Sequence, residues 1–279
     1  MHPGTLYVVA TPLGNLGDLS PRASEVLRTV AVVAAEDTRR TRQLFPPGDA
    51  APRLLSFHAH SDDRRLEMLL EILRDGRDVA VVSDAGTPGV SDPGADLVVA
   101  ARAAGIRVVP IPGPSAVVTA LSASGLPADR YTFLGFIPRK GTARRRLLGR
   151  AAAEEWSVVF FEAPHRLSEL LADLREACGG ARRATVAREL TKLHEEIVHG
   201  TLDELAAHWA VAEPRGEFTV VLQGTGEAVQ AAEPAPEDAA VLAAGFLAEG
   251  MSRKETARRL AEVTGLSRND AYRMVMELP

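Results

Sequence analysis

The sequence predicts an α/β protein of two domains with a small helical unit at its C-terminal end. Short runs of β-branched and other apolar residues alternate with amphipathic segments along most of the chain, which is typical of largely parallel sheets covered by helices. The chain has 279 residues and 46% of them are hydrophobic, enough for two separate cores. We expect an N-terminal α/β domain over 1–112, a C-terminal α/β domain over 113–224, a linker over 225–238 and a helix-turn-helix-like unit over 239–279.

Four strands separated by helices are expected in the first domain. The strands are Leu6–Ala10, Val30–Ala34, Val79–Ser83 and Arg107–Ile111. Helix starts are indicated by N-cap residues followed by proline, at Ser20-Pro21 and at Asp92-Pro93. Helix ends are indicated by Gly76 and Gly105. This order of strands and helices favours a parallel sheet.

The second domain is expected to be less regular. Its predicted strands are Thr132–Phe136, Trp156–Phe161, Ala184–Ala187, Glu196–Thr201 and Phe218–Gln223. Prolines 110, 112 and 114 interrupt the chain where we place the boundary between the two domains. The Gly, Ala, Glu and Pro content of Gly224–Asp238 leaves too few apolar residues to pack, which predicts a linker.

The C-terminal residues have the signals of two short helices. Ser252 and Glu255 form a capping box, Thr264–Leu266 is a turn, and Ser267 with Asp270 starts a second helix. The arrangement is similar to a helix-turn-helix. Packing of the two helices on the body of the protein or on a partner subunit is the alternative.

Composition excludes several classes of protein. The net charge of −5 argues against a general polyanion binder, so a nucleic-acid surface has to be local. The single cysteine, Cys178, excludes an intramolecular disulfide and a cysteine-based zinc cluster, and we assign it no role. Thr5–Ala10 is too short for a signal peptide, and Val108–Ala128 contains four prolines, which disfavours a membrane helix. We expect a soluble, cytoplasmic protein.

Ligands of open parallel sheets bind beyond the carboxyl ends of the strands, so the loops there are the first candidates for a site. The first loop is Thr11–Asp18. The loop Ser83–Gly94 is rich in glycine and proline, and its Asp84 is suited to accept hydrogen bonds from a ribose or an amine. A helix start at Ser115 offers free N–H groups to an anion. Glu36 has the spacing of a dinucleotide-binding acid, but no G-x-G-x-x-G motif precedes it.

These loops carry a resemblance to a known family. The blocks concerned are Val9–Asp18, Glu36–Arg39, Ser83–Gly94, Pro112–Ser115, Phe136–Gly141, Phe161–Arg166, Ala187–Lys192 and Gly216–Thr219. Together they resemble the ribosomal RNA small-subunit methyltransferase I family of the tetrapyrrole-methylase superfamily. The resemblance spans the whole chain, including the C-terminal helical unit.

The resemblance implies transfer of a methyl group from S-adenosylmethionine to the ribose 2′-oxygen of a cytidine in the decoding region of 16S rRNA, within the assembled small subunit. It also implies a homodimer with the class III methyltransferase fold, in which the donor binds between two α/β domains, and it implies no metal. The donor-binding residues carried over by position are Pro12, Asp84, Gly86, Thr87, Val90, Ser91, Ser115, Ala116, Phe161, Ala187 and Thr219.

A tetrapyrrole-like or other small molecule is the alternative acceptor. Porphyrin and corrin methylases have a more glycine-rich first loop and a Gly-Asp-Pro in the third. Thr11-Pro12 and Gly86-Thr87-Pro88 stand in those places here, which argues against a tetrapyrrole.

Local charge independently favours RNA. Seven basic residues and no acidic residue lie between Arg130 and Arg150, and five of them are the RNA-binding candidates: Arg139, Lys140, Arg144, Arg145 and Arg146. Three aromatic residues are interleaved with the start of this stretch and are suited to stack on bases: Tyr131, Phe133 and Phe136. For the two Phe residues, a place in the strand core is the favoured alternative. The alternative for the charges is a solvated helix face.

Methylation of a hydroxyl requires alignment with the methyl group and benefits from a base or a cation. The polar candidates in the matching motifs are Lys192, Arg188, Glu189, Glu36, Arg39 and His58. Lys192 is our first choice as the base, on the condition that its pKa is depressed. An ion-pair network that joins the domains is the alternative for this motif.

Two other classes of function remain as alternatives. His58-Ala59-His60 resembles the entry of a metal-dependent hydrolase, for which His165, His194 and His199 are the further candidate ligands, but none has a recognisable ligand spacing. A regulatory RNA-binding protein without activity is the other class. The loop Asp84–Ser91 argues against it, because no bulky or charged residue intrudes there.

Overall fold

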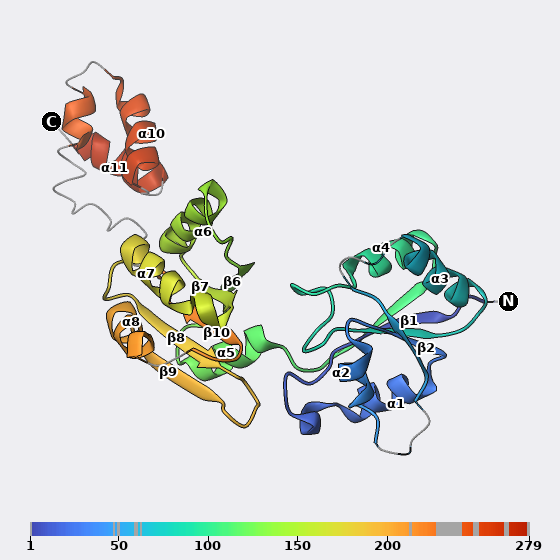
Figure 1. Ribbon diagram of the computed structural model, residues 1–279. Helices are drawn as coiled ribbons and strands as arrows, with labels where there is room; N and C mark the ends of the chain where they lie inside the picture. The colour runs from blue at the N-terminus through green and yellow to red at the C-terminus, as the bar shows by residue number, and fades with distance from the viewer. Residues whose placement is uncertain are drawn as a thin grey trace.

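The computed structural model of the chain describes residues 2–46, 48, 51–58, 61, 63–211, 214–226, 242–247, 251–264 and 268–277. Two five-stranded sheets, each covered by helices, make up most of it (Figure 1). We call them the N-terminal sheet, which contains β1 to β5, and the C-terminal sheet, which contains β6 to β10. Within the described part of the chain, every helix falls short of the length and apolar character that a bilayer-spanning segment needs.

The N-terminal sheet is entirely parallel, with the strand order β3-β2-β4-β1-β5. Its strands are β1 (Thr5–Val9), β2 (Val32–Ala35), β3 (Arg53–Ser56), β4 (Val79–Val82) and β5 (Arg107–Ile111). The central strands β2 and β4 are buried on both faces, as their unbroken runs of Val and Ala require. Strand β3 was not predicted, because this edge strand has only two apolar residues, Leu54 and Leu55, between polar ones.

Helices cover both faces of this sheet (Figure 1). They are η1 (Leu16–Asp18), α1 (Pro21–Thr29), α2 (Thr38–Arg42), α3 (Asp63–Arg74) and α4 (Ala95–Ala103). The predicted cap of α1 is confirmed, since Ser20 Oγ accepts a hydrogen bond of 3.1 Å from the backbone N–H of Ala23. The predicted start at Asp92-Pro93 is wrong: α4 begins at Ala95 with Gly94 as its N-cap, and Asp92 stays in the preceding loop.

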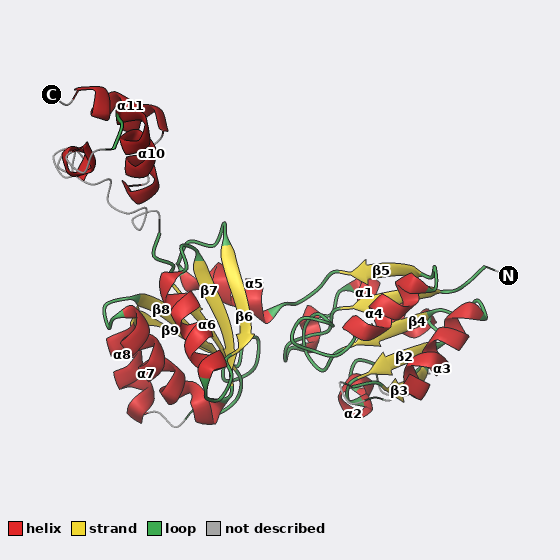
Figure 2. Cartoon of the chain, turned by 90° about the horizontal axis from the view of Figure 1, so that it is seen from above, coloured by secondary structure: helices red, strands yellow, loops and turns green. Residues whose placement is uncertain are grey.

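The C-terminal sheet is mixed, with the order β6-β7-β10-β8-β9. Figure 2 shows this sheet with its strands β6, β7, β8 and β9 labelled. Its strands are β6 (Tyr131–Phe136), β7 (Ser157–Glu162), β8 (Arg183–Arg188), β9 (Glu196–Thr201) and β10 (Phe218–Leu222). Only β6 and β7 are parallel neighbours, and the other pairs are antiparallel. The helices are α5 (Ala116–Ser124), α6 (Thr142–Ala153), η2 (Pro164–Arg166), α7 (Leu167–Cys178) and α8 (Leu202–Val211).

The two faces of the C-terminal sheet have different cover. Helix α5 packs on one face through Val117 and Leu121, while α6, α7 and α8 pack on the other around Phe160 and Trp209. Because α5 belongs to the core of the C-terminal sheet, the chain passes from one sheet to the other between Ile111 and Ala116.

The C-terminal helices α10 (Arg253–Thr264) and α11 (Arg268–Glu277) form their own small core. The predicted capping box is confirmed: Glu255 Oε2 accepts from the backbone N–H of Ser252 at 3.1 Å, and Ser252 Oγ accepts in return from the N–H of Glu255. Most of the predicted linker, the turn at Gly265 and Leu266, and Ser267 lie outside the described residues.

Candidate active site

A cavity of about 400 Å³ lies between the two sheets and is lined by residues from both. On the N-terminal side, the lining follows the carboxyl ends of the strands: Leu13 after β1, Glu36 and Arg40 after β2, Asp84–Thr87, Val90 and Asp92 after β4, and Ser115–Val117 after β5. On the C-terminal side, it comes from the ends of β6 and β7 and the start of β10: Phe136, Phe161–Pro164 and Gly216–Thr219. Parallel sheets bind ligands at this edge.

Many residues expected to bind the donor line this cavity. They are Asp84, Gly86, Thr87, Val90, Ser115, Ala116, Phe161 and Thr219. Three expected residues lie beside it instead. Pro12 is buried next to Leu13, which takes the lining position, and Ala187 is buried in the core under α5 next to Thr219. Ser91 is exposed and its hydroxyl lies close to β6 at Gly135.

The loop after β4 is held in place by the loop after β1. Thr11 and Gly86 form an isolated antiparallel bridge with two backbone hydrogen bonds of 2.9 and 3.0 Å. The hydroxyl of buried Thr11 also donates to Ser83 O at 3.1 Å. Gly86 has φ of +86°, and a Cβ there would lie only 3.3 Å from Leu13 Cδ2. The backbone conformation therefore favours glycine, and a Cβ would in addition push the Leu13 side chain aside.

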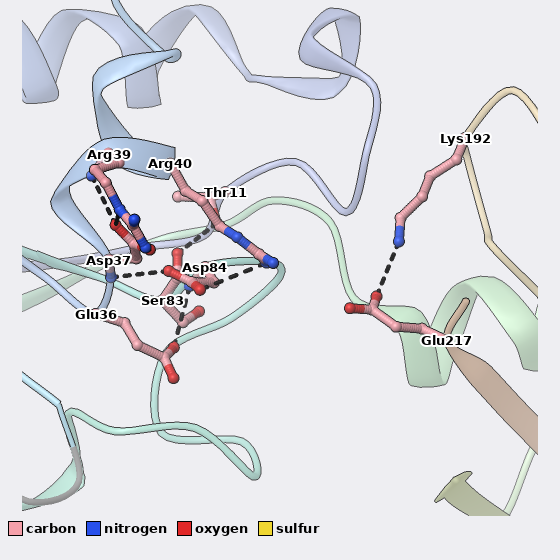
Figure 3. A network of polar contacts seen from close by, with 9 residues as sticks. All are labelled: Thr11, Glu36, Asp37, Arg39, Arg40, Ser83, Asp84, Lys192 and Glu217. Carbon is pink, nitrogen blue, oxygen red and sulfur yellow. Dashed lines mark hydrogen bonds and ion pairs between the residues drawn. The ribbon is translucent and has the colours of Figure 1, made fainter. Parts of the chain in front are cut away.

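Acidic side chains form a network on the N-terminal side of the cavity (Figure 3). The backbone N–H of Asp84 donates to Glu36 Oε2 at 3.2 Å, and Asp84 Oδ1 accepts from the N–H of Asp37 at 2.9 Å. Arg40 lies 3.5 Å from Asp84 Oδ2. Glu36 thus lines the cavity and positions the loop that carries Asp84, although no dinucleotide motif accompanies it.

Asp92, which was predicted to cap a helix, lines the cavity instead. Burial, followed by the nearby charge of Glu36, raises the pKa of Asp92 to about 6, although a hydrogen bond with Ser83 opposes this. Asp84 and Glu217 contribute further negative charge. The missed signal was its place in the same glycine-rich loop as Asp84. A half-buried carboxyl among other carboxylates is typical of functional sites.

Lys192 is held by two glutamates. Its Nζ donates to Glu189 Oε1 at 2.8 Å. It also donates to Glu217 Oε2 at 3.1 Å, as Figure 3 shows. Burial disfavours the ammonium, but the hydrogen bonds to Glu189 and Glu217 outweigh it and raise the pKa of Lys192. The same contacts lower the pKa of Glu189 against its desolvation. A role of Lys192 as the base would require a depressed pKa, and this expectation is wrong because the pKa is raised. The side chain is a cation at neutral pH.

The turn that carries Lys192 is unusual. Glu189 and Thr191 both have positive φ, 49° and 66°, which is uncommon for residues other than glycine. Glu189 Oε1 also accepts from the backbone N–H of Glu217 at 2.9 Å, and a Cβ at Gly216 would overlap the Glu189 carboxylate. The network fixes the start of β10 against the end of β8, next to the cavity.

Of the catalytic candidates, only Glu36 lines the cavity; Lys192 and Glu189 lie beside it, and Arg188, Arg39 and His58 are engaged elsewhere. Arg188 donates to Arg215 O at 2.8 Å and pairs with Glu196 at 3.2 Å, so it ties β8 to its neighbours. The side chain of Arg39 is 89% exposed and pairs with Asp37. His58 is exposed, and its backbone N–H donates to Ser61 Oγ at 2.9 Å.

The metal-hydrolase motif is described only in part, since residues 59, 60 and 62 lie outside the described residues. Among the residues that are described, His, Cys, Asp and Glu side chains nowhere gather in a group of three or more that would hold a metal ion.

The basic stretch separates into two roles. Arg139, Lys140, Arg145 and Arg146 are exposed on the loop after β6 and on α6. Arg144 is only 5% exposed: it donates to Asp173 at 2.6 Å and to Pro138 O at 3.1 Å. Arg144 therefore does not belong to an RNA-facing surface, because its guanidinium is enclosed between α6 and α7.

Comparisons with known proteins agree with this architecture. A family model described as Tetrapyrrole (Corrin/Porphyrin) Methylases matches residues 5–206. A protein of Xylella fastidiosa strain Temecula1, named Ribosomal RNA small subunit methyltransferase I, is 49% identical over 277 residues, which cover 97% of this chain and 98% of that protein.

Solved structures show the same fold. A crystal structure of the methyltransferase CobJ superposes with a TM-score of 0.63 at 22% identity and covers 80% of this chain and 95% of that one. A uroporphyrin-III C-methyl transferase from Thermus thermophilus, complexed with S-adenyl homocysteine, has a TM-score of 0.56 at 20% identity and covers 79% and 97%. The expected fold of two α/β domains of the tetrapyrrole-methylase type, with C-terminal helices, is confirmed.

Proposed function

This chain belongs to the ribosomal RNA small subunit methyltransferase I family of the tetrapyrrole methylases, and on that premise we propose that it methylates the ribose 2′-oxygen of a cytidine in the decoding region of 16S rRNA. The donor is S-adenosylmethionine. The observation that carries the proposal is the cavity between the two sheets, where most of the residues expected to bind the donor come together.

The cavity has the chemistry that this donor needs. Leu13, Val90 and Phe161 supply apolar surface for a flat adenine. The free N–H groups at the start of α5, where Ser115 makes no side-chain cap, suit the methionine carboxylate. Asp84 is placed to accept from a ribose hydroxyl or an amine. Because Gly86 has no side chain, space remains between the two loops that a Cβ would occupy.

We assign Pro12, Ser91 and Ala187 supporting roles in donor binding. Pro12 is buried next to the lining residue Leu13, and Ala187 is buried next to Thr219, with which it pairs. The hydroxyl of Ser91 lies close to Gly135 of β6. Bound S-adenosylmethionine supplies an electrophilic methyl group on a positively charged sulfur. The carboxylates of Glu36, Asp84 and Asp92 favour such a charge in the cavity.

We assign two roles in the methyl transfer: Lys192 stabilises charge on the attacking oxygen, and Asp92 accepts its proton. The ammonium of Lys192 stabilises negative charge that develops on the ribose oxygen, because Glu189 and Glu217 keep it protonated and oriented. Asp92 accepts the hydroxyl proton, since its pKa of about 6 leaves it ionised yet basic at neutral pH. Glu189 acts as a positioning residue for Lys192. Arg188 supports the same turn from the end of β8, where it contacts Arg215 O and Glu196.

The acceptor reaches the cavity from the side of α6. Arg139, Lys140, Arg145 and Arg146 are exposed there and are suited to contact phosphates of the RNA. The name of the relatives supports rRNA of the small subunit as the acceptor. The assembled particle as the substrate, a cytoplasmic location and a homodimer are further parts of the proposal. We place the domain boundaries after residues 112 and 224, next to the ends of β5 and β10.

Methyl transfer to ribosomal particles tests the proposal. The protein is incubated with S-adenosylmethionine carrying a tritiated methyl group and with small subunits from a strain that lacks this activity. Naked 16S rRNA and a uroporphyrinogen serve as parallel acceptors. We expect label in the rRNA of the subunits. Label in the tetrapyrrole alone would move the chain to the small-molecule methylases, and no label in any acceptor would contradict the proposed acceptor.

A further inference from the structure

Phe136 is a large aromatic side chain left exposed at the rim of the cavity. It is 54% exposed, although it is the last residue of β6 and lines the cavity. Phe133, on the same strand, packs against the core under α5. An exposed phenyl ring beside a pocket costs hydration free energy unless a ligand covers it.

A β-bulge turns Phe136 toward the cavity. The pairing of β6 with β7 shifts register between Phe133 and Gly135, so that one residue of β6 has no partner. Without the shift, side chains three residues apart on a strand lie on opposite faces. Here both rings meet Phe161, with centroid distances of 4.9 Å for Phe133 and 5.7 Å for Phe136. Leu134 packs on the other face of the sheet.

Gly135 makes the bulge possible. Its φ is +62°, and a Cβ at this position would lie 3.2 Å from Ser91 Oγ, which comes from the loop after β4. Glycine adopts this backbone conformation without strain, whereas a residue with a Cβ would be strained and would also displace the Ser91 hydroxyl. The bulge that aims Phe136 is therefore also a contact between the two sheets.

The backbone after Phe136 is fixed as well. Ile137 is fully buried and its carbonyl accepts from Arg166, while the carbonyl of Pro138 accepts from Arg144 at 3.1 Å. Arg139 and Lys140 follow and are exposed. Phe136 therefore has a fixed position at the rim of the cavity, and the exposed cations Arg139 and Lys140 follow it within four residues of the chain.

We propose that Phe136 is the platform on which the base of the acceptor nucleotide stacks. The inference rests on the proposed function, because a nucleotide whose ribose is methylated has its base free to be held next to the donor cavity. Bases of unpaired RNA stack on aromatic rings, and neighbouring cations hold the adjoining phosphates. The edge-to-face contact with Phe161 keeps the ring oriented without covering its exposed side.

Steady-state kinetics and donor binding test the platform. For Phe136→Ala we expect the KM for small subunits to rise about tenfold or more, as for the loss of a base–aromatic stack. The Kd for S-adenosylhomocysteine, measured by calorimetry, stays within about twofold of the wild-type value. Phe136→Tyr and Phe136→Trp keep the wild-type KM, and Phe136→Leu, which retains apolar area but no aromatic ring, behaves like alanine.

Tyr131→Ala is the matched control. Tyr131 is 41% exposed on the same edge strand but does not line the cavity, so its loss leaves the KM unchanged. An unchanged KM for Phe136→Ala, full activity of Phe136→Leu, or an equal loss of donor affinity would each overturn the platform. Wild-type protein that leaves small subunits unmethylated would instead overturn the proposed function, and the inference with it.

Discussion

The methylene carbons of Lys192 lie directly against the α-carbon of Gly14, so that a Cβ on Gly14 would overlap them. This contact joins the turn after β8 to the loop after β1, which carries the cavity residue Leu13. The Lys192 ammonium continues past it to Glu217 on the wall of the cavity. One side chain therefore links the two sheets and places a cation beside the site.

Gly14→Ala tests this contact. The added methyl group has to displace the Lys192 stem, and we expect kcat to fall about tenfold or more because the ammonium moves away from its position. A double-mutant cycle with Lys192→Ala measures the coupling. In the Lys192→Ala background, Gly14→Ala has nothing to displace and is expected to have no further effect. Additive losses in the double variant would contradict the contact.

Lys192 is expected to act as a cation and not as a base. Lys192→Gln should lower kcat about 100-fold, as for the loss of one donor to a developing oxyanion, with little change in donor affinity. Since the pKa of Lys192 is raised, the wild-type pH–rate profile should show no ionisation of this residue between pH 7 and pH 9. A basic group in that range that disappears in Lys192→Gln would instead restore the role of base.

Asp92 is expected to cost stability when it is ionised. Its pKa is raised from 3.8 to about 6, so the folded protein binds more protons than the unfolded chain over that range, and the penalty grows as the pH rises from 4 to 6. At pH 8, Asp92→Asn removes this penalty and should increase the free energy of unfolding. We expect a gain of only about 1 kcal/mol, because solvent screens part of the charge of the half-exposed carboxylate. Below pH 4 the gain disappears. Urea unfolding at several pH values measures it, and a gain that persists at pH 3.5 would contradict the assignment.

The same variant tests Asp92 as the proton acceptor. The wild-type kcat is expected to fall as the pH drops through 6, and Asp92→Asn should lower kcat at pH 8 about 100-fold and remove this ionisation. A variant with wild-type kcat would leave Asp92 without a role in proton transfer.

Arg144 is expected to be a structural residue. Arg144→Met leaves Asp173 without its partner and the carbonyl of Pro138 without a donor, which should lower the free energy of unfolding by about 2–3 kcal/mol. Arg146→Met, on the exposed side of the same helix, should change it by less than about 0.5 kcal/mol. Both tryptophans lie near the C-terminal sheet and report its unfolding. Equal stabilities would contradict the buried role.

The fold was largely predictable because strand and helix patterns are local. The runs of Val and Ala in β2 and β4, and Ser20 before Pro21, each specify their structure within a few residues. The exceptions depend on distant partners. Strand β3 is short and half polar, and it becomes a strand only because β2 pairs with it. Asp92 precedes a proline like an N-cap residue, but the helix begins three residues later at Ala95.

The site was predictable as a set of loops and less so as a set of residues. The strand ends and their glycines identify the loops, because parallel strands bring their carboxyl ends to one edge. The protonation of Lys192 depends on Glu217, which is 25 residues away in the sequence, and the burial of Arg144 depends on Asp173 on another helix. The direction of Phe136 depends on a bulge that the sequence pattern of β6 does not reveal.

Nucleoside analysis of the methylated product tests the central claim most directly. The rRNA of small subunits labelled by the wild-type protein is first cut into defined fragments to locate the label. The labelled fragment is then digested to nucleosides, which are identified by chromatography and mass spectrometry. The account predicts that the label is recovered as 2′-O-methylcytidine from the decoding region. Label in a base-methylated nucleoside, or in a ribose elsewhere in the rRNA, would contradict it.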